Sequence, residues 1–170
     1  GDPRAITAIC WRLEHFRRGV RRAAVKAIAL VAERGNALAI HEISQRLRHR
    51  NADVRQAALE AMAKVAEAND DRAIVGTAAR LTDHSAHVRQ SAVQSLADVA
   101  ERGDGLTVDC IIAQLGHRDG VVRRAALESL SAMSETGDED SIESVCSLLE
   151  HWDAGVRQTV LEALPLVAER

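Results

Sequence analysis

The feature that most restricts the fold of this chain is a repeat with a period of 34 residues. The stretch VRRAAVKAIALVAERGN, which begins at Val20, returns in closely related form at Val54, Val88, Val122 and Val156. Five such blocks account for the whole length of 170 residues. A fixed period of this size is typical of proteins that stack copies of one small unit. We therefore predict a single repeat domain over 1–170, with units 1–34, 35–68, 69–102, 103–136 and 137–170.

Each unit is predicted to hold two amphipathic helices joined by a short turn. In the fourth unit, apolar residues between Val108 and Leu115 recur with the i, i+3, i+4, i+7 spacing of a helix that buries one face. A polar turn, GHRDG, separates this helix from a second one that begins near Val122. The loop that follows the second helix contains a glycine, such as Gly137, at the position where a left-handed residue usually ends a helix.

The residue just before the second helix is able to cap that helix in four of the five units. These residues are Asn51, Ser85, Asp119 and Asp153. Asn, Ser and Asp side chains accept hydrogen bonds from the free N–H groups of the first helical turn. Because the first unit has Arg17 at this position, we predict a side-chain cap in every unit except the first.

Apolar residues occupy the same positions in all five units and are expected to form the core. The first helices supply two columns, Ile6, Ile40, Ile74, Val108 and Ile142, and Leu13, Leu47, Leu81, Leu115 and Leu149. The second helices supply a third, Ile28, Met62, Leu96, Leu130 and Leu164. One helical pair cannot bury its apolar stripe alone, whereas stacked pairs cover one another. We therefore predict an all-α solenoid of five stacked helical hairpins.

The second helix resembles that of HEAT-like repeats, whose hallmark is a Val-Arg pair followed by an Ala-rich helix that contains Leu. The five pairs are Val20-Arg21, Val54-Arg55, Val88-Arg89, Val122-Arg123 and Val156-Arg157. The resemblance covers the whole chain and is nearest to the short, diverged HEAT-like repeats also found in phycobilin lyases. It implies a right-handed α-solenoid whose second helices line a concave face.

One position departs from the HEAT pattern, in which an Asp six residues before the Arg forms a hydrogen-bonded ladder between repeats. That position holds His15, His49, Asp83, His117 and His151. We expect the arginines to bond turn carbonyls where the Asp is missing. We interpret the histidines as structural, because a partly charged imidazole suits the dipole at the C-terminal end of a helix. Since successive repeats lie roughly 8–10 Å apart, the histidines are too distant to share a metal ion.

The sequence predicts no catalytic site, no cofactor and no metal. His41-Glu42 resembles one of the His-Glu pairs with which deoxyhypusine hydroxylase, a HEAT-like enzyme, binds a di-iron centre. The matching positions of the other four units hold no such pair, so we interpret His41 and Glu42 as part of a solvated helix face. The sequence also lacks a Gly-rich phosphate loop, a CxxC pair and a nucleophile elbow.

The cysteines and the hydropathy pattern lead us to expect an intracellular, cytoplasmic protein. Cys10, Cys110 and Cys146 are interpreted as buried or half-buried free thiols in a reducing compartment. No apolar run approaches the roughly 18 residues that span a bilayer, and the N-terminal residues do not resemble a signal peptide. Because both ends fall on a repeat boundary, we expect the chain to be a segment of a longer HEAT-like protein or an engineered sequence.

Charge changes steadily along the chain. The five units carry net charges of +5, +1, −1, −2 and −6, which give the total of −3. Such a gradient is compatible with head-to-tail association of copies or with solubility alone. Nucleic acid is disfavoured as a partner, because the total is acidic and stacking aromatic residues are scarce.

Aromatic residues stand in the turns of the first and last units. Phe16 and Trp152 share one turn position, where the middle units have Arg50, His84 and Arg118. An aromatic side chain there could anchor a partner or cover the apolar end of the stack. We favour the second interpretation.

The outer positions of the second helices vary between units while the core stays constant. One row holds Arg22, Gln56, Gln90, Arg124 and Gln158, and the next holds Lys26, Glu60, Gln94, Glu128 and Glu162. A constant framework with a variable surface suits a binding scaffold. We predict that these ten residues form the face on which a non-enzymatic scaffold binds a protein or peptide. The alternative is a structural spacer that associates head to tail through the charge gradient.

Overall fold

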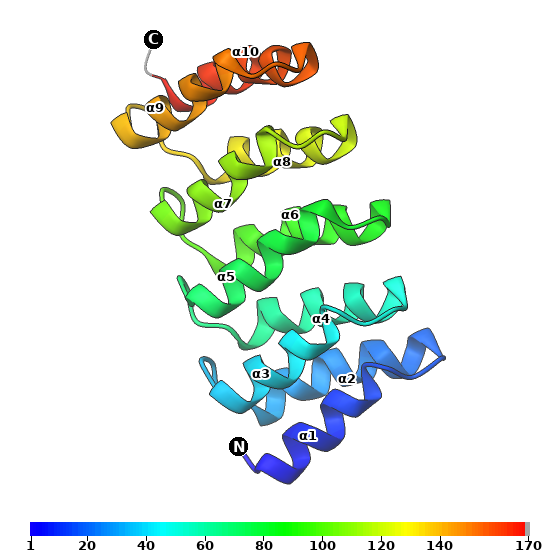
Figure 1. Ribbon diagram of the computed structural model, residues 1–170. Helices are drawn as coiled ribbons and strands as arrows, with labels where there is room; N and C mark the ends of the chain where they lie inside the picture. The colour runs from blue at the N-terminus through cyan, green and yellow to red at the C-terminus, as the bar shows by residue number, and fades with distance from the viewer. Residues whose placement is uncertain (169–170) are drawn as a thin grey trace.

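The computed structural model describes residues 1–168 as a stack of five helical hairpins (Figure 1). The first helices of the hairpins are α1 (Pro3–Arg12), α3 (Ala37–Arg46), α5 (Asp71–Ala78), α7 (Gly105–Leu115) and α9 (Glu139–Ser147). The second helices are α2 (Arg18–Val31), α4 (Ala52–Val65), α6 (Ala86–Val99), α8 (Gly120–Met133) and α10 (Ala154–Val167). Two 3-10 segments, η1 (Ala79–Thr82) and η2 (Leu148–Glu150), continue α5 and α9. The predicted all-α solenoid is confirmed.

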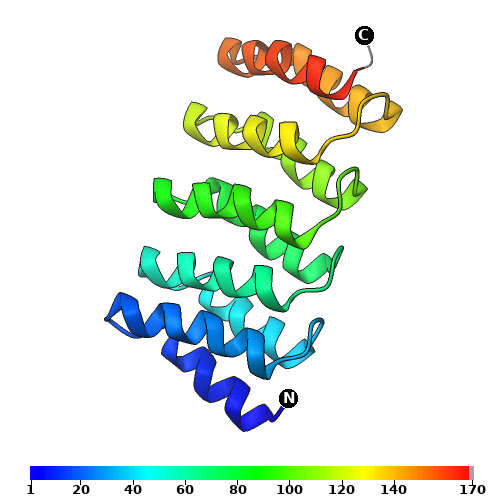
Figure 2. The same cartoon turned by 180° about the vertical axis from the view of Figure 1, so that it is seen from behind.

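The helices form two layers, and each hairpin packs on the next along the chain. Figure 2 shows the second helices side by side in one layer, from α2 at one end to α10 at the other. The first helices form the second layer, and the termini lie at opposite ends of the stack (Figures 1 and 2). Contacts between neighbours in sequence order therefore build the fold, as in other solenoids. In the described part of the chain, no helix combines the length and apolar character needed to cross a membrane.

The predicted core columns are buried in the first four hairpins and only partly in the fifth. Ile28, Met62, Leu96 and Leu130 are inaccessible to solvent, whereas Leu164 in the same column is half-buried. The expectation for Leu149 is wrong, because this side chain is 39% exposed. In the inner hairpins the matching leucine lies under the next hairpin, as Leu47 does beneath Gly76. The described residues place no further hairpin over Leu149.

A backbone clasp recurs at all four junctions between hairpins. The second-to-last residue of each connecting loop is left-handed, with φ of 75° at Gly35, 61° at Asn69, 80° at Gly103 and 89° at Gly137. Its N–H donates to the carbonyl of the last residue of the next second helix, at 2.7 to 2.9 Å. Gly137 is left-handed as predicted, but it does not end the helix, because α8 ends at Met133 and Ser134 caps it in an extended conformation. The clasp satisfies a carbonyl that a helix C-terminus leaves free and ties each hairpin to its neighbour.

The second helices begin at the predicted positions, and three of the four predicted caps form. Asn51, Asp119 and Asp153 each accept a hydrogen bond from the N–H two residues later. Ser85 makes no such bond, and nothing in its surroundings explains the difference. Arg17 also leaves α2 without a side-chain cap, as predicted.

Candidate protein-binding surface

The ten predicted residues form one strip across the second-helix layer. The two residues of each pair lie one helical turn apart on α2, α4, α6, α8 and α10. All are exposed except Gln56, which is half-buried and whose amide nitrogen donates to the carboxylate of Glu60 at 3.1 Å. The spacing of four residues in the sequence therefore does bring the two rows onto one surface.

Three grooves run along this strip. The N-terminal groove, of about 700 Å³, lies over α2, α4 and the start of α6, and its walls include Phe16, Arg18, Arg22, Asp53 and His87. A middle groove of about 300 Å³ lies over α2, α4 and α6. The C-terminal groove, of about 460 Å³, lies over α8 and α10.

Seven of the ten predicted residues line these grooves. They are Arg22, Gln56, Glu60, Gln94, Arg124, Gln158 and Glu162. Lys26, Gln90 and Glu128 are exposed outside them. The sequence analysis missed groove residues such as Arg18, Asp53 and His87, which lie about one helical turn nearer the N-terminus of each second helix. The same helical period would have found them, had the rows been extended by one turn.

The arginine of each Val-Arg pair closes its own turn. In all five hairpins its Nη1 atom donates to two carbonyl oxygens of the preceding turn, at distances from 2.6 to 3.3 Å. The arginines that do this are Arg21, Arg55, Arg89, Arg123 and Arg157. The expectation that these arginines bond turn carbonyls is confirmed.

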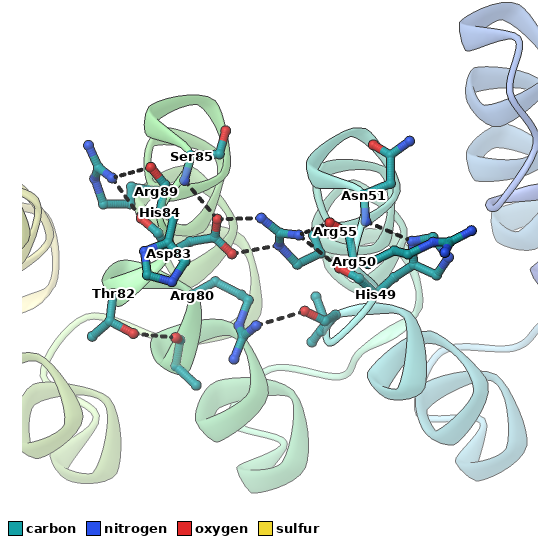
Figure 3. Close-up of polar contacts among 12 residues, drawn as sticks. His49, Arg50, Asn51, Arg55, Arg80, Thr82, Asp83, His84, Ser85 and Arg89 are labelled. Atoms are coloured by element: carbon teal, nitrogen blue, oxygen red, sulfur yellow. Dashed lines mark hydrogen bonds and ion pairs between the residues drawn. The ribbon is translucent and has the colours of Figure 1, made fainter.

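Three of these arginines also reach the next hairpin. Arg55 forms a two-pronged ion pair with Asp83, at 2.6 and 2.7 Å (Figure 3). Arg21 donates to Asp53 at 2.6 Å and Arg123 to the Thr159 hydroxyl at 3.0 Å. The sequence analysis identified Asp83 as a partner and missed the other two, because they stand at different positions of the repeat.

The environment of Asp83 favours its ionised form. Burial raises the pKa of the Asp83 carboxyl, but hydrogen bonds from Arg55 and from the Ser85 N–H, with the charges of Arg55 and Arg80, lower it more. The net result is a pKa below the ordinary value for Asp. Asp83 therefore pairs with Arg55 and also accepts a hydrogen bond from the N–H of Ser85, the residue before α6.

The histidines of the turn play the same local part as Asp83. The Nδ1 atoms of His15, His49, His117 and His151 accept hydrogen bonds from the N–H two residues later, at 3.0 to 3.1 Å. These hydrogen bonds give the four histidines a structural role in the turn, as the sequence analysis expects.

His41 and Glu42 point to different partners. The Glu42 carboxylate is half-buried and forms an ion pair with Arg46 at 2.7 Å, so it does not belong to a solvated face as predicted. His41 is exposed, and its Nε2 atom lies 3.2 Å from the amide nitrogen of Gln45. Among residues 1–168, no three or more His, Cys, Asp or Glu side chains gather as a possible metal site.

The turn aromatic residues do not cover the ends of the stack. Phe16 is 79% exposed and Trp152 is 82% exposed. Each ring stacks instead on the histidine beside it, with centroids 4.5 Å apart for His15 and Phe16 and 5.4 Å apart for His151 and Trp152. A turn between two helices projects from the side of the stack, so a side chain there cannot reach its end face.

The three cysteines are free thiols. Cys10 is fully buried, and Cys110 and Cys146 are half-buried, as the sequence analysis predicts. Burial raises the pKa of Cys10 to about 11, although the positive charge of Arg46 opposes the shift. Burial also raises the pKa of Cys110. Neither thiol is set up as a nucleophile, because the thiolate is the reactive form.

Comparison with known proteins agrees with this architecture. The sequence matches the family described as HEAT repeats over residues 6–97 and again over residues 74–165. No curated protein matches the sequence. A designed armadillo repeat protein in complex with the peptide (KR)4 is 17% identical, with 95% of this chain and 81% of that chain covered and a TM-score of 0.51.

Two further structures show the same likeness in fold. A structure of computationally designed armadillo repeat proteins for modular peptide recognition is 18% identical, covers 96% of this chain and 82% of that chain, and has a TM-score of 0.50. An engineered protein from the Northeast Structural Genomics Consortium is 22% identical, covers 98% of this chain and 86% of that chain, and also has a TM-score of 0.50.

Proposed function

The chain belongs to the HEAT-repeat family, and from that premise we propose that it is a scaffold that binds an extended segment of a partner protein along the strip of its second helices. The observation that carries the proposal is the contrast between constant and variable positions. The core columns keep their apolar character in every hairpin, while the exposed rows change from Arg22 and Lys26 to Gln158 and Glu162. A surface that differs from one hairpin to the next can bind a different side chain of an extended ligand at each hairpin.

The chemistry of the grooves supports this proposal. The N-terminal groove combines cations such as Arg22 with the acidic Glu60, and the C-terminal groove combines Arg124 with Glu162. Each also has an exposed apolar side chain, Phe16 in the first and Val121 in the second. An extended segment would therefore find charged and apolar partners at both ends of the strip. Four repeat steps of roughly 8–10 Å correspond to about 10–12 residues of extended chain.

The likeness to designed armadillo repeat proteins supports a partner of this kind. One of them is in complex with the peptide (KR)4. The proposed role is non-enzymatic, in line with the usual use of HEAT and armadillo folds as scaffolds. The peptide that this chain would bind has to be found by experiment, because fold alone does not fix a ligand.

Selection of a random dodecapeptide library displayed on phage tests the proposal. The purified chain serves as bait, and enriched peptides are measured by fluorescence anisotropy against two quadruple variants. The face variant carries Arg22→Ala, Lys26→Ala, Arg124→Ala and Glu128→Ala. The control variant carries Arg4→Ala, Arg12→Ala, Arg118→Ala and Asp109→Ala, which change the charge equally at exposed positions away from the strip.

The proposal predicts that the face variant loses at least about tenfold in affinity, because each charged contact in a binding site contributes about 1 kcal/mol or more. The control variant should bind as the native chain does. A failure to enrich any peptide, or equal loss in both variants, would contradict binding on the strip.

A head-to-tail spacer is the second candidate function. It is supported by the charge difference between unit 1–34, at +5, and unit 137–170, at −6. Leu161, which is 57% exposed, adds apolar surface to the last hairpin. Sedimentation velocity at low and high salt separates the candidates: self-association that weakens with salt favours the spacer, and a monomer at low salt counts against it.

A further inference from the structure

A separate groove lies in the first-helix layer, between α3 and α5. This first-helix groove has a volume of about 370 Å³, and its walls come from α3, the Leu47-Arg48 segment, α5 and η1. Gly76 keeps it open, because a Cβ atom at this position would lie 3.1 Å from Cδ1 of Leu47. The matching positions of the other hairpins hold Ala8, Glu42, Cys110 and Ser144. The groove is therefore a local property of the second and third hairpins.

Three arginines line the first-helix groove, and no Asp or Glu does. They are Arg48, Arg72 and Arg80, beside the polar side chains of His41 and Ser44. Arg72 is paired with Asp70 at 2.9 Å. Arg48 and Arg80 make no ion pair within residues 1–168 and so remain available to an anion.

Arg80 is held in place but incompletely satisfied. Its Nη1 atom donates to the Leu47 carbonyl at 2.9 Å (Figure 3), whereas its Nε atom is buried and has no acceptor within the described structure. Burial lowers the pKa of Arg80, Asp83 opposes that change, and the charges of Arg55 and Arg48 lower the pKa further. An anionic oxygen near Arg80 would both accept a hydrogen bond and reduce this repulsion.

Apolar side chains complete the first-helix groove. Val75 is 51% exposed, and Ile40, Leu47 and Ala79 lie beside it on the walls. Small-molecule sites in proteins have volumes of about 300–1,000 Å³ and combine apolar walls with a few convergent polar groups. The first-helix groove meets both conditions, and its arginines give it cationic groups.

We propose that the first-helix groove binds a small amphiphilic anion. Arg48 and Arg80 hold its carboxylate or sulfonate group, and its apolar body packs on Val75 and Ile40. This site lies in the opposite layer from the strip of second helices, so it does not depend on the function proposed for that strip.

Fluorescence of anilinonaphthalene sulfonate, an aromatic sulfonate, provides the first test. The dye should bind the native chain with one strong site, octanoate should displace it, and octylamine, which has the opposite charge, should not. The variant Val75→Glu places a carboxylate in the groove and should weaken dye binding about tenfold or more. Leu30→Glu is the matched control, because Leu30 is 87% exposed on α2 and lies outside the groove.

A second pair of variants keeps the test decisive if Val75→Glu disturbs folding, which thermal unfolding by circular dichroism would reveal. Arg48→Gln should weaken the dye and octanoate together, whereas Arg50→Gln, at an exposed turn residue outside the groove, should change neither. Absence of dye binding, displacement by octylamine as strong as by octanoate, or equal effects of the paired variants would overturn the proposal.

Discussion

The two halves of the stack share one apolar framework but are joined by different polar contacts. At the first two junctions, Arg21 pairs with Asp53 and Arg55 pairs with Asp83 in the second-helix layer. At the last junction Arg123 donates to an uncharged acceptor, the Thr159 hydroxyl, and at the third Arg102 donates to the Ser134 carbonyl. The bridging arginines of the N-terminal half therefore pair with carboxylates, whereas those of the C-terminal half bond uncharged acceptors.

The first-helix layer shows the same difference. Arg46 is buried and donates from Nε to the Cys10 carbonyl at 2.9 Å, while Nε also lies 3.1 Å from the Glu14 carboxylate of the first hairpin. The matching position of the third hairpin holds Arg80, and those of the fourth and fifth hold Gln114 and Leu148. The apolar columns and the backbone clasps recur at all four junctions, so they specify the stack. The ion pairs between arginines and carboxylates are an addition in the N-terminal half, and they make its stability depend on charge.

The largest difference between the halves is expected at the position of Arg46. Arg46→Ala leaves the half-buried carboxylates of Glu14 and Glu42 close together without a cation, and we expect a loss of about 4 kcal/mol in the free energy of unfolding. Gln114→Ala at the matching position should cost less than about 1 kcal/mol, because its amide bonds only the Cys110 carbonyl of its own helix. Urea unfolding followed by circular dichroism measures both. Equal losses would contradict the comparison.

The turn position of Asp83 should show the next largest effect. Asp83→Ala removes both hydrogen bonds to Arg55 and the bond from Ser85, and we expect a loss of about 3 kcal/mol. His117→Ala, at the matching position, removes one bond from the Asp119 N–H and should cost about 1 kcal/mol. The same unfolding measurement compares them, and a ratio near one would show that the ion pair adds nothing to the local turn contact.

The pH dependence of Asp83 follows from the sign of its pKa shift. Because the pKa of Asp83 is lower in the folded chain than in the unfolded one, its stabilising contribution is complete above the ordinary pKa of about 3.9. The contribution is lost as the pH falls through the folded pKa. The stability difference between the native chain and Asp83→Asn should therefore be constant near neutral pH and disappear in acid.

A carboxylate placed at the third junction should make it resemble the second. His117→Asp puts an acidic group where Asp83 stands one repeat earlier, within reach of Arg89, which bonds only the carbonyls of its own turn in the described structure. We expect a gain of about 1 kcal/mol, since the new pair is partly buried and the turn bond to the Asp119 N–H is kept. The gain should vanish in a background that carries Arg89→Gln. Loss of stability in both backgrounds would show that His117 stabilises the third junction better than a carboxylate does.

Much of this comparison could be predicted from the sequence, and its limits have a physical cause. The period places every helix, the left-handed Gly137 and the arginine contacts to turn carbonyls, because these depend on backbone positions that recur. The period does not predict that Arg46 contacts two hairpins or that Arg21 pairs with Asp53, because a long side chain can reach several positions of the next repeat. Burial at the last hairpin was also mispredicted at Leu149, since the repeat pattern describes an inner unit with a neighbour on both sides.

In the candidate binding strip, too, the features that depend on the repeat period could be predicted from the sequence. Position along the helix predicts that Arg22 and Glu162 face outward, because helical geometry alone decides it. The first-helix groove could not be predicted, because it arises from one glycine, Gly76, opposite a leucine of the preceding hairpin. Periodicity describes what repeats, whereas this groove depends on a residue that does not.

The last comparison between the halves is a difference in thiol reactivity at one position of the repeat, which does not measure stability directly. Cys10 and Cys146 occupy the same position, but Cys10 is fully buried beside Arg46, while Cys146 is half-buried. With a pKa of about 11, Cys10 is thiolate in about one molecule in a thousand at pH 8, and its burial requires the first hairpin to open before a reagent can enter. In variants that retain one cysteine each, a disulfide reagent such as Ellman's should therefore modify Cys146 at least about a hundredfold faster than Cys10.

Arg46→Ala should accelerate the reaction of Cys10 and leave that of Cys146 unchanged, because Arg46 ties the first hairpin to the second. If the two thiols react at equal rates, Arg46 does not keep the first hairpin packed on the second. The junctions with ion pairs would then open as readily as those without them.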